Sequence, residues 1–335
     1  MRRLLVLILL VIGPVSAVAD GKSIPFQEIV EQDILPGFAE LNQKTAIMAD
    51  ETESSCNAAD LRRKYIEAFR AWARVSHLRF GPSEQENRAF ALAFWPDPRG
   101  KTPKALRKLL LNPDPDALTP EAYEQVSIAA RGFYALDYLL FDPEIATLGT
   151  PDQRCALVRA VARDIHATAQ DLDLAWHGYA PVLTAPGPDA PYRSGDEVLQ
   201  VLYKSASTGL QFTADMRFGR PLGTFEKPRP KRAEAWRSGQ SLALIRQAVA
   251  GSGGLALRLA ADDPVLASRL DYALTRFDQS AAELGDPTLA GVSTPQGRIR
   301  VEALLNDLNA IRRIVDQDLG AHLGVIAGFN ALDGD

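Results

Sequence analysis

The segment ARGFYALDYLLFD, Ala130 to Asp142, carries the strongest fold signal in this chain. On a helix, its apolar side chains and those just before it fall on two stripes at heptad spacing. One stripe comprises Val126, Ala129, Phe133, Leu136 and Leu140, and the other comprises Ala130, Tyr134, Asp137 and Phe141. A helix that is apolar around most of its circumference is typical of a buried element. The segment therefore predicts a buried helix.

Asp137 is the unusual residue of that helix. A carboxylate inside a protein costs free energy unless it is paired, hydrogen-bonded, bound to a cation or neutralised. Tyr134 lies three residues earlier and projects to the same side of a helix. Catalysis, ligand binding and a structural role are all open explanations of Asp137 on this observation alone.

Helical periodicity continues in both directions from this segment, and strand-like alternation is nearly absent. Thr119-Pro120-Glu121 resembles an N-cap with proline at the first helical position, and it predicts the start of the helix that carries Asp137. Further helices are expected over residues 60–78, from 151 towards 176, and over 198–218, 232–250, 264–284 and 298–319. We therefore expect an all-α fold of two packed helical domains, each resembling a four-helix bundle.

The Pro- and Gly-rich stretch APGPDAPYRSG, residues 185–195, is the expected domain boundary. Residues 20–187 then form the N-terminal bundle and residues 188–335 the C-terminal bundle. A second irregular segment, 219–230, is expected to cross between helices or domains. The basic run KPRPKR, Lys227 to Arg232, is interpreted as a linker because prolines interrupt it.

Residues 1–19 have the layout of a secretory signal peptide, with two arginines, an apolar run and the small-residue site Ala17-Val18-Ala19. The apolar run, Leu4 to Ile12, is shorter than the ~20 residues of a membrane span. Removal of the signal peptide leaves 35 basic and 42 acidic residues, a formal charge of −7. A chain of that balance has no general attraction to nucleic acid. Because of the signal-peptide pattern, we expect a periplasmic or secreted protein.

Cys56 and Cys155 are the two cysteines of the chain. In an exported protein an even count predicts one disulfide. Closing a loop of that length contributes ~4–5 kcal/mol in the chain-entropy description. A redox-active pair is the alternative, but such pairs are usually closely spaced, as in CxxC. A structural disulfide is therefore the prediction.

Common catalytic signatures such as HExxH, GxSxG, Walker A and GxGxxG do not occur in the sequence. Asp97, in FWPDPRG (Phe94 to Gly100), lies between two prolines that restrict the local backbone. It is expected either to form a rigid turn or to place a fixed carboxylate at the rim of a pocket.

Several segments, in order, resemble the imelysin-like proteins, which are also classified as a peptidase family. They are AWARVSHLRFGP (71–82), FWPDP (94–98), GFYALDYLLF (132–141), RPLG (220–223), AEAWRSGQSL (233–242) and GFNALDGD (328–335). The resemblance implies an all-α fold of two helical bundles, an envelope or secreted location and a role in bacterial iron acquisition. The family's GxHxxE motif, beside a cleft between the bundles, is matched here by Gly132, Tyr134 and Asp137. The histidine is therefore absent and the acid is one methylene shorter.

This departure weakens a peptidase assignment, because catalytic zinc usually has three protein ligands with histidine among them. Carboxylate and phenolate oxygens instead suit ferric iron. We predict a ligand-binding site in the cleft formed by Gly132, Tyr134, Asp137 and Asp97, with Tyr134 and Asp137 as metal ligands. The expected ligand is ferric iron, haem or another iron-carrying molecule. A buried hydrogen-bond network around Asp137 is the structural alternative.

The leading expectation is a non-catalytic binding or accessory protein of iron uptake, which works with envelope iron-uptake proteins. A metal-dependent peptidase of the imelysin family is the second expectation. A structural adaptor that docks a membrane or redox partner is the third.

Overall fold

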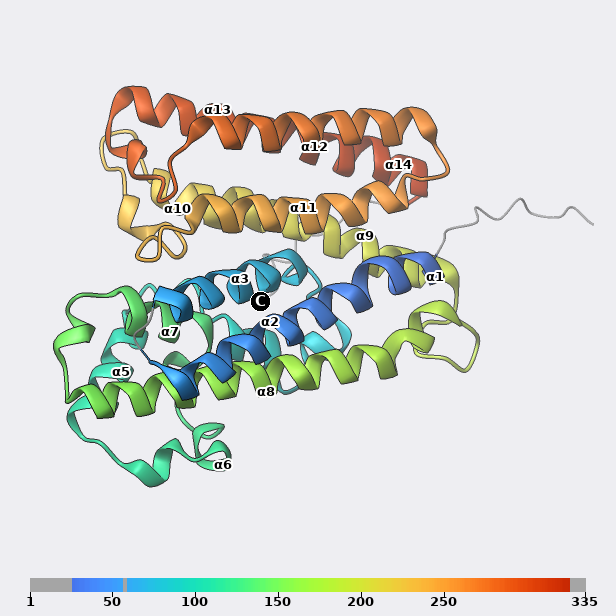
Figure 1. Ribbon diagram of the computed structural model, residues 1–335. Coiled ribbons are helices and arrows are strands. Elements are labelled where there is room, and N and C mark those ends of the chain that lie inside the picture. Colours follow the sequence, from blue (N-terminus) through green and yellow to red (C-terminus); the bar gives the residue numbers. More distant parts are fainter. Residues whose placement is uncertain (1–25, 57–58, 326–335) are drawn as a thin grey trace, which may run out of the picture.

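Helices form two layers in the computed structural model, which describes residues 26–56 and 59–325 (Figure 1). The predicted signal peptide and the segment GFNALDGD lie outside the described residues. No strand occurs in the described ranges, so the prediction of an all-α fold is confirmed. The predicted domain boundary falls in the connection between α8 and α9, residues 185–194, which links one layer to the other.

The N-terminal layer is built round three long helices, α2 (Leu35–Ser54), α3 (Ala59–Val75) and α8 (Pro151–Thr184). Helix α8 starts where proline predicts it, with a reciprocal capping box between Thr150 and Gln153. The shorter helices of this layer are α1 (Phe26–Ile29), the π-helix η1 (Val30–Ile34), α4 (Arg88–Leu92), α5 (Lys101–Leu111), α6 (Pro120–Tyr123) and α7 (Gly132–Phe141). Helix α7 packs on α8 at the left of Figure 1.

The C-terminal layer consists of α9 (Gly195–Phe212), α11 (Ser241–Leu259), α12 (Pro264–Leu284) and α13 (Pro295–Arg313). Two π-helices extend α9 and α13, namely η7 (Thr213–Phe218) and η10 (Ile314–Leu319), and the short helices α10 (Gly219–Leu222) and α14 (Gly320–Leu323) follow them. Single 3-10 turns connect the elements of both layers: η2 (Gly81–Ser83), η3 (Gln85–Asn87), η4 (Pro115–Leu118), η5 (Ile128–Ala130), η6 (Ile145–Thr147), η8 (Pro230–Arg232) and η9 (Ala290–Ser293).

The two layers meet chiefly where α3 lies against α11 (Figure 1). Gly251 of α11 makes this close approach possible, because a Cβ there would lie 1.8 Å from the carbonyl oxygen of Arg74. Buried apolar residues run from one layer into the other as one continuous core. Burial of apolar surface across this contact therefore holds the layers together.

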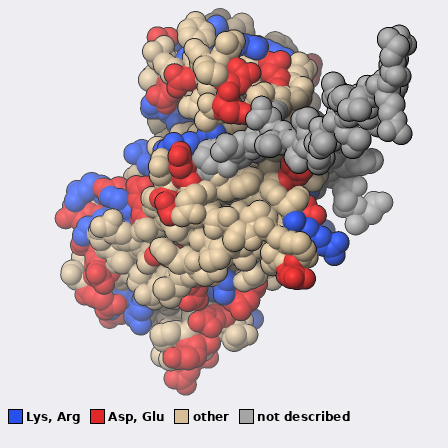
Figure 2. Space-filling model, turned by 90° about the vertical axis from the view of Figure 1, so that its right-hand side faces the viewer, with Lys and Arg blue, Asp and Glu red and all other residues tan. Residues whose placement is uncertain are grey.

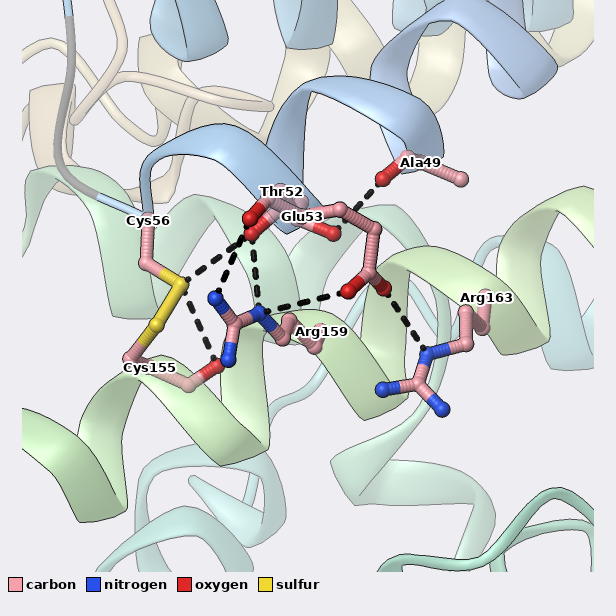
Figure 3. Close-up of polar contacts among 7 residues, drawn as sticks. All are labelled: Ala49, Thr52, Glu53, Cys56, Cys155, Arg159 and Arg163. Atoms are coloured by element: carbon pink, nitrogen blue, oxygen red, sulfur yellow. Dashed lines mark hydrogen bonds and ion pairs between the residues drawn. A yellow bond between two sulfur atoms is a disulfide. The ribbon is translucent and has the colours of Figure 1, made fainter.

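The predicted disulfide is confirmed. Cys56 follows α2 and Cys155 is the fifth residue of α8 (Figure 3), with 5.2 Å between their Cα atoms. Beside it, Arg159 donates from Nε to the Thr52 carbonyl oxygen at 2.9 Å. Arg159 and Arg163 also lie within ion-pair distance of Glu53 (Figure 3). The bond and these contacts tie the end of α2 to α8.

The predicted start of the helix that carries Asp137 is wrong. Thr119 caps only the one-turn helix α6, and α7 begins separately at Gly132. Gly132 has a φ of +73°, and a Cβ there would lie 2.2 Å from the Ala91 carbonyl oxygen. The chain therefore turns sharply at Gly132, where glycine alone is tolerated, and a single helix cannot continue from Thr119 to Asp137.

The helix predicted over residues 232–250 also begins too early, because α11 starts at Ser241. The residues before it form turns, with positive φ at Ala235 (+48°) and Gly239 (+70°). Residues with positive φ interrupt a right-handed helix. The segment 233–240 is instead wrapped against α7 and α3, where it contributes side chains to the site described below.

No helix in residues 26–56 or 59–325 is long and apolar enough to cross a bilayer. On the face shown in Figure 2, acidic and basic residues are intermixed round the edge, and uncharged residues occupy much of the middle of the larger layer.

Candidate functional site

Two cavities lie side by side between the helical layers and share two wall residues, Trp95 and Tyr134. The first cavity, about 100 Å³, is bordered by α3, the end of α9, η7 and Glu234. The second cavity, about 120 Å³, is bordered by residues 94–102, α7 and the segment 220–237. Three of the four predicted site residues, Tyr134, Asp137 and Asp97, line the second cavity.

Gly132, the fourth predicted residue, lines neither cavity in the described structure. A Cβ at this position would lie 2.2 Å from the Ala91 carbonyl oxygen and 2.4 Å from that of Leu92, so the close approach requires glycine. That contact seats the first turn of α7 against the segment that leads to Trp95. Gly132 is therefore a positioning residue, and it brings Tyr134 next to Trp95, whose ring centroid is 6.2 Å from that of Tyr134.

Tyr134 belongs to a chain of buried polar groups that joins the two layers. Its hydroxyl donates to Oε1 of Glu234, and Oε2 of the same carboxylate accepts from Nε of Arg217 at 2.6 Å. Arg217 also donates to the Thr213 hydroxyl at 3.1 Å. Burial, and then the charge of Glu234, raise the pKa of Tyr134 well above its usual value of 10.0. Tyr134 is therefore a neutral phenol that serves as a hydrogen-bond donor.

Arg217 lies in the π-helix η7, and π-turns are frequent at functional sites. Arg217 is 5% exposed and Glu234 is 3% exposed. Charges at that depth must be paired and hydrogen-bonded, and each of these two has the other as its partner.

Asp137 lies in a second hydrogen-bonded group on the neighbouring turn of α7. Its Oδ1 accepts from the Tyr65 hydroxyl at 3.1 Å, and the same hydroxyl lies 3.2 Å from the Phe133 carbonyl oxygen. Burial raises the pKa of Asp137 from 3.8 to about 6, opposed by a hydrogen bond from Ser238 and by the charge of Arg237. This arrangement is the structural alternative that the sequence left open.

Asp97 combines both roles that its sequence context allows. Its Oδ2 accepts from the backbone N–H of Thr102 at 2.8 Å, which fixes the turn that leads into α5. Its Oδ1 and the Thr102 hydroxyl are buried and have no hydrogen-bond partner among the described residues. Both residues border the second cavity.

These residues do not fit a bare ferric ion held by Tyr134 and Asp137. The Tyr134 oxygen is a protonated donor to Glu234, whereas ferric iron prefers an anionic oxygen. In the described parts of the chain, no three His, Cys, Asp or Glu side chains are grouped so as to hold a metal ion. His77, which lines the first cavity, has its pKa lowered by burial to about 4 and lies 3.1 Å from the Arg74 carbonyl oxygen.

Several site residues were missed by sequence reasoning. Glu234 and Arg217 lie 100 and 83 positions from Tyr134, so their meeting depends on tertiary packing. In AEAWRSGQSL, the two alanines that flank Glu234 are the local sequence feature that indicates its burial. The interpretation of KPRPKR as a linker missed Lys231 and Arg232, which border the second cavity together with Arg220 and Arg237.

Comparisons with known proteins agree with this architecture. A family model described as Imelysin matches residues 34–315. Iron-regulated protein A of Synechococcus elongatus is 25% identical, with 91% of this chain and 86% of that protein aligned.

Two solved structures are also similar. An imelysin-like protein of Psychrobacter arcticum has a TM-score of 0.71 and 20% identity, covering 91% of this chain and 96% of that one. A Parabacteroides distasonis protein assigned as an iron-regulated protein A precursor has a TM-score of 0.69 and 14% identity, covering 87% and 92%. At these identities the two structures share the fold with this chain.

Proposed function

This chain belongs to the imelysin family, and we propose that it is a non-catalytic binding component of bacterial iron uptake. The observation that carries the proposal is the pair of cavities between the helical layers, joined at Trp95 and Tyr134. Ligand sites in helical proteins are commonly formed between packed helices. The name of the relative Iron-regulated protein A supports a link to iron, and the signal-peptide pattern of residues 1–19 supports a periplasmic site of action.

The polar groups of the site support binding over catalysis. Tyr134, Glu234 and Arg217 satisfy one another, and Asp137 accepts from Tyr65. A group that is already fully hydrogen-bonded is a poor nucleophile or metal ligand, because its existing bonds must be broken first. Such a network is well suited to hold a binding surface rigid.

The size of the cavities limits what they enclose. Volumes of about 100 and 120 Å³ are similar to the roughly 150 Å³ of a cavity that encloses benzene. A haem macrocycle is several times larger than benzene, so it would project from either cavity. A small iron-carrying molecule would project less than haem and therefore fits the proposal better.

Titration of the purified protein with ferric iron, ferrous iron, ferric citrate, haem and zinc tests the proposal. We expect at least one iron species to bind and Trp95→Leu to weaken that binding about tenfold, because it removes a wall of both cavities. Tyr272→Leu is the matched control, since Tyr272 is a 70% exposed aromatic residue on α12. Absence of iron binding, or binding that ignores Trp95→Leu, would remove the proposal.

A metal-dependent peptidase is the second candidate, and one observation favours it. Asp137 borders a cavity with its pKa raised by burial to about 6, and shifted carboxyl groups in clefts are often catalytic. This candidate predicts chelator-sensitive cleavage of an unfolded substrate with added zinc, abolished by Asp137→Asn. Failure to cleave under those conditions would exclude it.

A further inference from the structure

The second cavity carries basic side chains that the fold does not neutralise. Arg220, Lys231 and Arg232 border it, and none of them has an ion pair with a described residue. Arg237 differs, because its Nε donates to Asp142 at 2.6 Å. Three cations without an ion pair to a described residue thus border one small cavity, whose acidic wall residues are Asp97 and Asp137.

Arg220 gives the strongest single indication. Its Nε is buried without a hydrogen-bond partner in the described part of the chain, and a buried, unsatisfied donor costs free energy. Burial and the nearby charge of Arg232 lower the pKa of Arg220. An anionic acceptor at this point would supply the missing hydrogen bond and relieve the repulsion.

The backbone holds these cations in place. Arg220 lies in α10, and Lys231 and Arg232 lie in the 3-10 turn η8. A hydrogen bond of 2.8 Å from the backbone N–H of Arg229 to the Pro221 carbonyl oxygen joins the two elements. The basic groups are therefore presented by a closed loop, whose rim residues Lys231 and Arg232 are exposed.

The remaining wall of the cavity adds aromatic faces and hydrogen-bonding oxygens. The Arg220 guanidinium lies 5.7 Å from the Trp95 ring centroid, and the Lys231 ammonium lies 5.6 Å from that of Trp236. Asp97 Oδ1, which has no partner among the described residues, is an acceptor suited to a ligand hydroxyl. The cavity thus offers cations for carboxylates and an acceptor for a hydroxyl.

We propose that the second cavity binds a small hydroxy-polycarboxylate through Arg220, Lys231 and Arg232, with its hydroxyl group on Asp97. The planar guanidinium of Arg220 matches a carboxylate in a bidentate arrangement. Such molecules are also oxygen-donor chelators of ferric iron. The inference rests on the proposed function only where it takes the bound molecule to be the carrier of the iron.

Isothermal titration with citrate, in about 50 mM salt and with tryptophan fluorescence as a second readout, tests the inference. We expect citrate to bind, and Arg220→Gln and the double variant Lys231→Gln/Arg232→Gln each to weaken binding about tenfold or more. The double variant changes two exposed residues, so the test stands even if Arg220→Gln does not fold. Arg193→Gln/Lys204→Gln removes two exposed cations outside both cavities, and we expect its citrate affinity to stay within about twofold.

Two further ligands sharpen the assignment. Propane-1,2,3-tricarboxylate, which lacks the hydroxyl group, is expected to bind about tenfold more weakly than citrate, because Asp97 then loses its partner. Inorganic phosphate is expected to bind more weakly than citrate. No citrate binding, equal binding by the cavity and control variants, or tighter binding of phosphate would overturn the inference.

Ferric citrate separates this inference from the proposed function. If citrate binds as described but ferric citrate, haem and iron salts do not, the hydroxy-polycarboxylate site stands and the iron-uptake function fails. If an iron species binds and is sensitive to Trp95→Leu while citrate does not bind, the function stands and this inference fails.

Discussion

The two cavities that share Trp95 and Tyr134 differ in how their charges are balanced. In the first cavity Arg217 and Glu234 are almost fully buried and paired with each other. In the second cavity Arg220 is half-buried, Lys231 and Arg232 are exposed, and none of the three is paired within the described chain. A buried charge must find its partner in the fold, whereas a charge at a rim is solvated by water until a ligand arrives.

The difference separates a structural role from a binding role on adjacent surfaces. The first network joins α7 of one layer to η7 and residue 234 of the other, so its loss is expected to act on stability. The exposed rim residues Lys231 and Arg232 have no ion pair with a described residue. Their substitution is therefore expected to lower ligand affinity and to leave stability nearly unchanged. Four measurements, ordered by expected effect, test this division.

Glu234→Ala should have the largest effect, a loss of about 3–5 kcal/mol in the free energy of unfolding, because it leaves Arg217 buried without a counter-charge. Urea denaturation measures it. Asp278→Ala breaks the exposed Arg246–Asp278 pair and should cost no more than about 1 kcal/mol. Similar losses in the two variants would contradict the structural role of the first network.

Gly132→Ala should lower the free energy of unfolding by about 3 kcal/mol, since it combines an unfavourable positive φ with a clash against the Ala91 carbonyl oxygen. Gly178→Ala is the matched control in α8, where an added Cβ meets nothing within 4 Å. We expect that control to stabilise the protein by about 0.5–1 kcal/mol. A neutral Gly132→Ala would show that α7 does not depend on the turn at this position.

Asp137 should make the stability depend on pH. Its pKa is raised in the folded state from 3.8 to about 6, so the folded protein holds a proton that the unfolded chain releases. The contribution of Asp137 to stability is therefore greatest below about pH 4, and it falls by about 2–3 kcal/mol as the pH rises to about 6. The difference between the wild type and Asp137→Asn, measured by urea denaturation from pH 4 to 7, isolates this contribution. A pH-independent difference would show that Asp137 is not held protonated by burial.

Lys231→Gln/Arg232→Gln should have the smallest effect on stability, within about 0.5 kcal/mol, because both side chains are exposed. Thermal or urea denaturation measures it on the same protein used for the citrate titration. A large destabilisation would mean that these cations stabilise the fold. The assignment of a structural role to the first cavity and a binding role to the second would then be wrong.

Much of the helical architecture can be predicted from the sequence because its signals are local. Pro151 begins α8, and the helix expected over residues 264–284 matches α12. The Cys56–Cys155 disulfide was predictable because the chain has two cysteines and the sequence pattern of an exported protein. In each case the deciding residues lie within one element or have one possible partner.

The site was predicted less completely. Sequence reasoning identified Tyr134, Asp137 and Asp97, which line the second cavity, but it gave the first two a metal-binding role that their hydrogen bonds do not fit. It also set aside KPRPKR, because prolines in a basic run are typical of a linker. Tertiary contacts bring that run to the cavity, among them the hydrogen bond from the Arg229 N–H to the Pro221 carbonyl oxygen and those from Arg298 to the Leu222 and Thr224 carbonyl oxygens, and no local pattern reveals them.

Residue order alone is enough to specify the helices, their caps and the buried character of α7, since periodicity and capping depend on neighbours along the chain. The partner of each buried polar group is decided by tertiary packing. Tyr134 meets Glu234, and Tyr65 meets Asp137, only because α3 and α7 pack together and the 233–240 turn lies against them. The same packing determines which charges are paired inside the protein and which remain at the rim for a ligand.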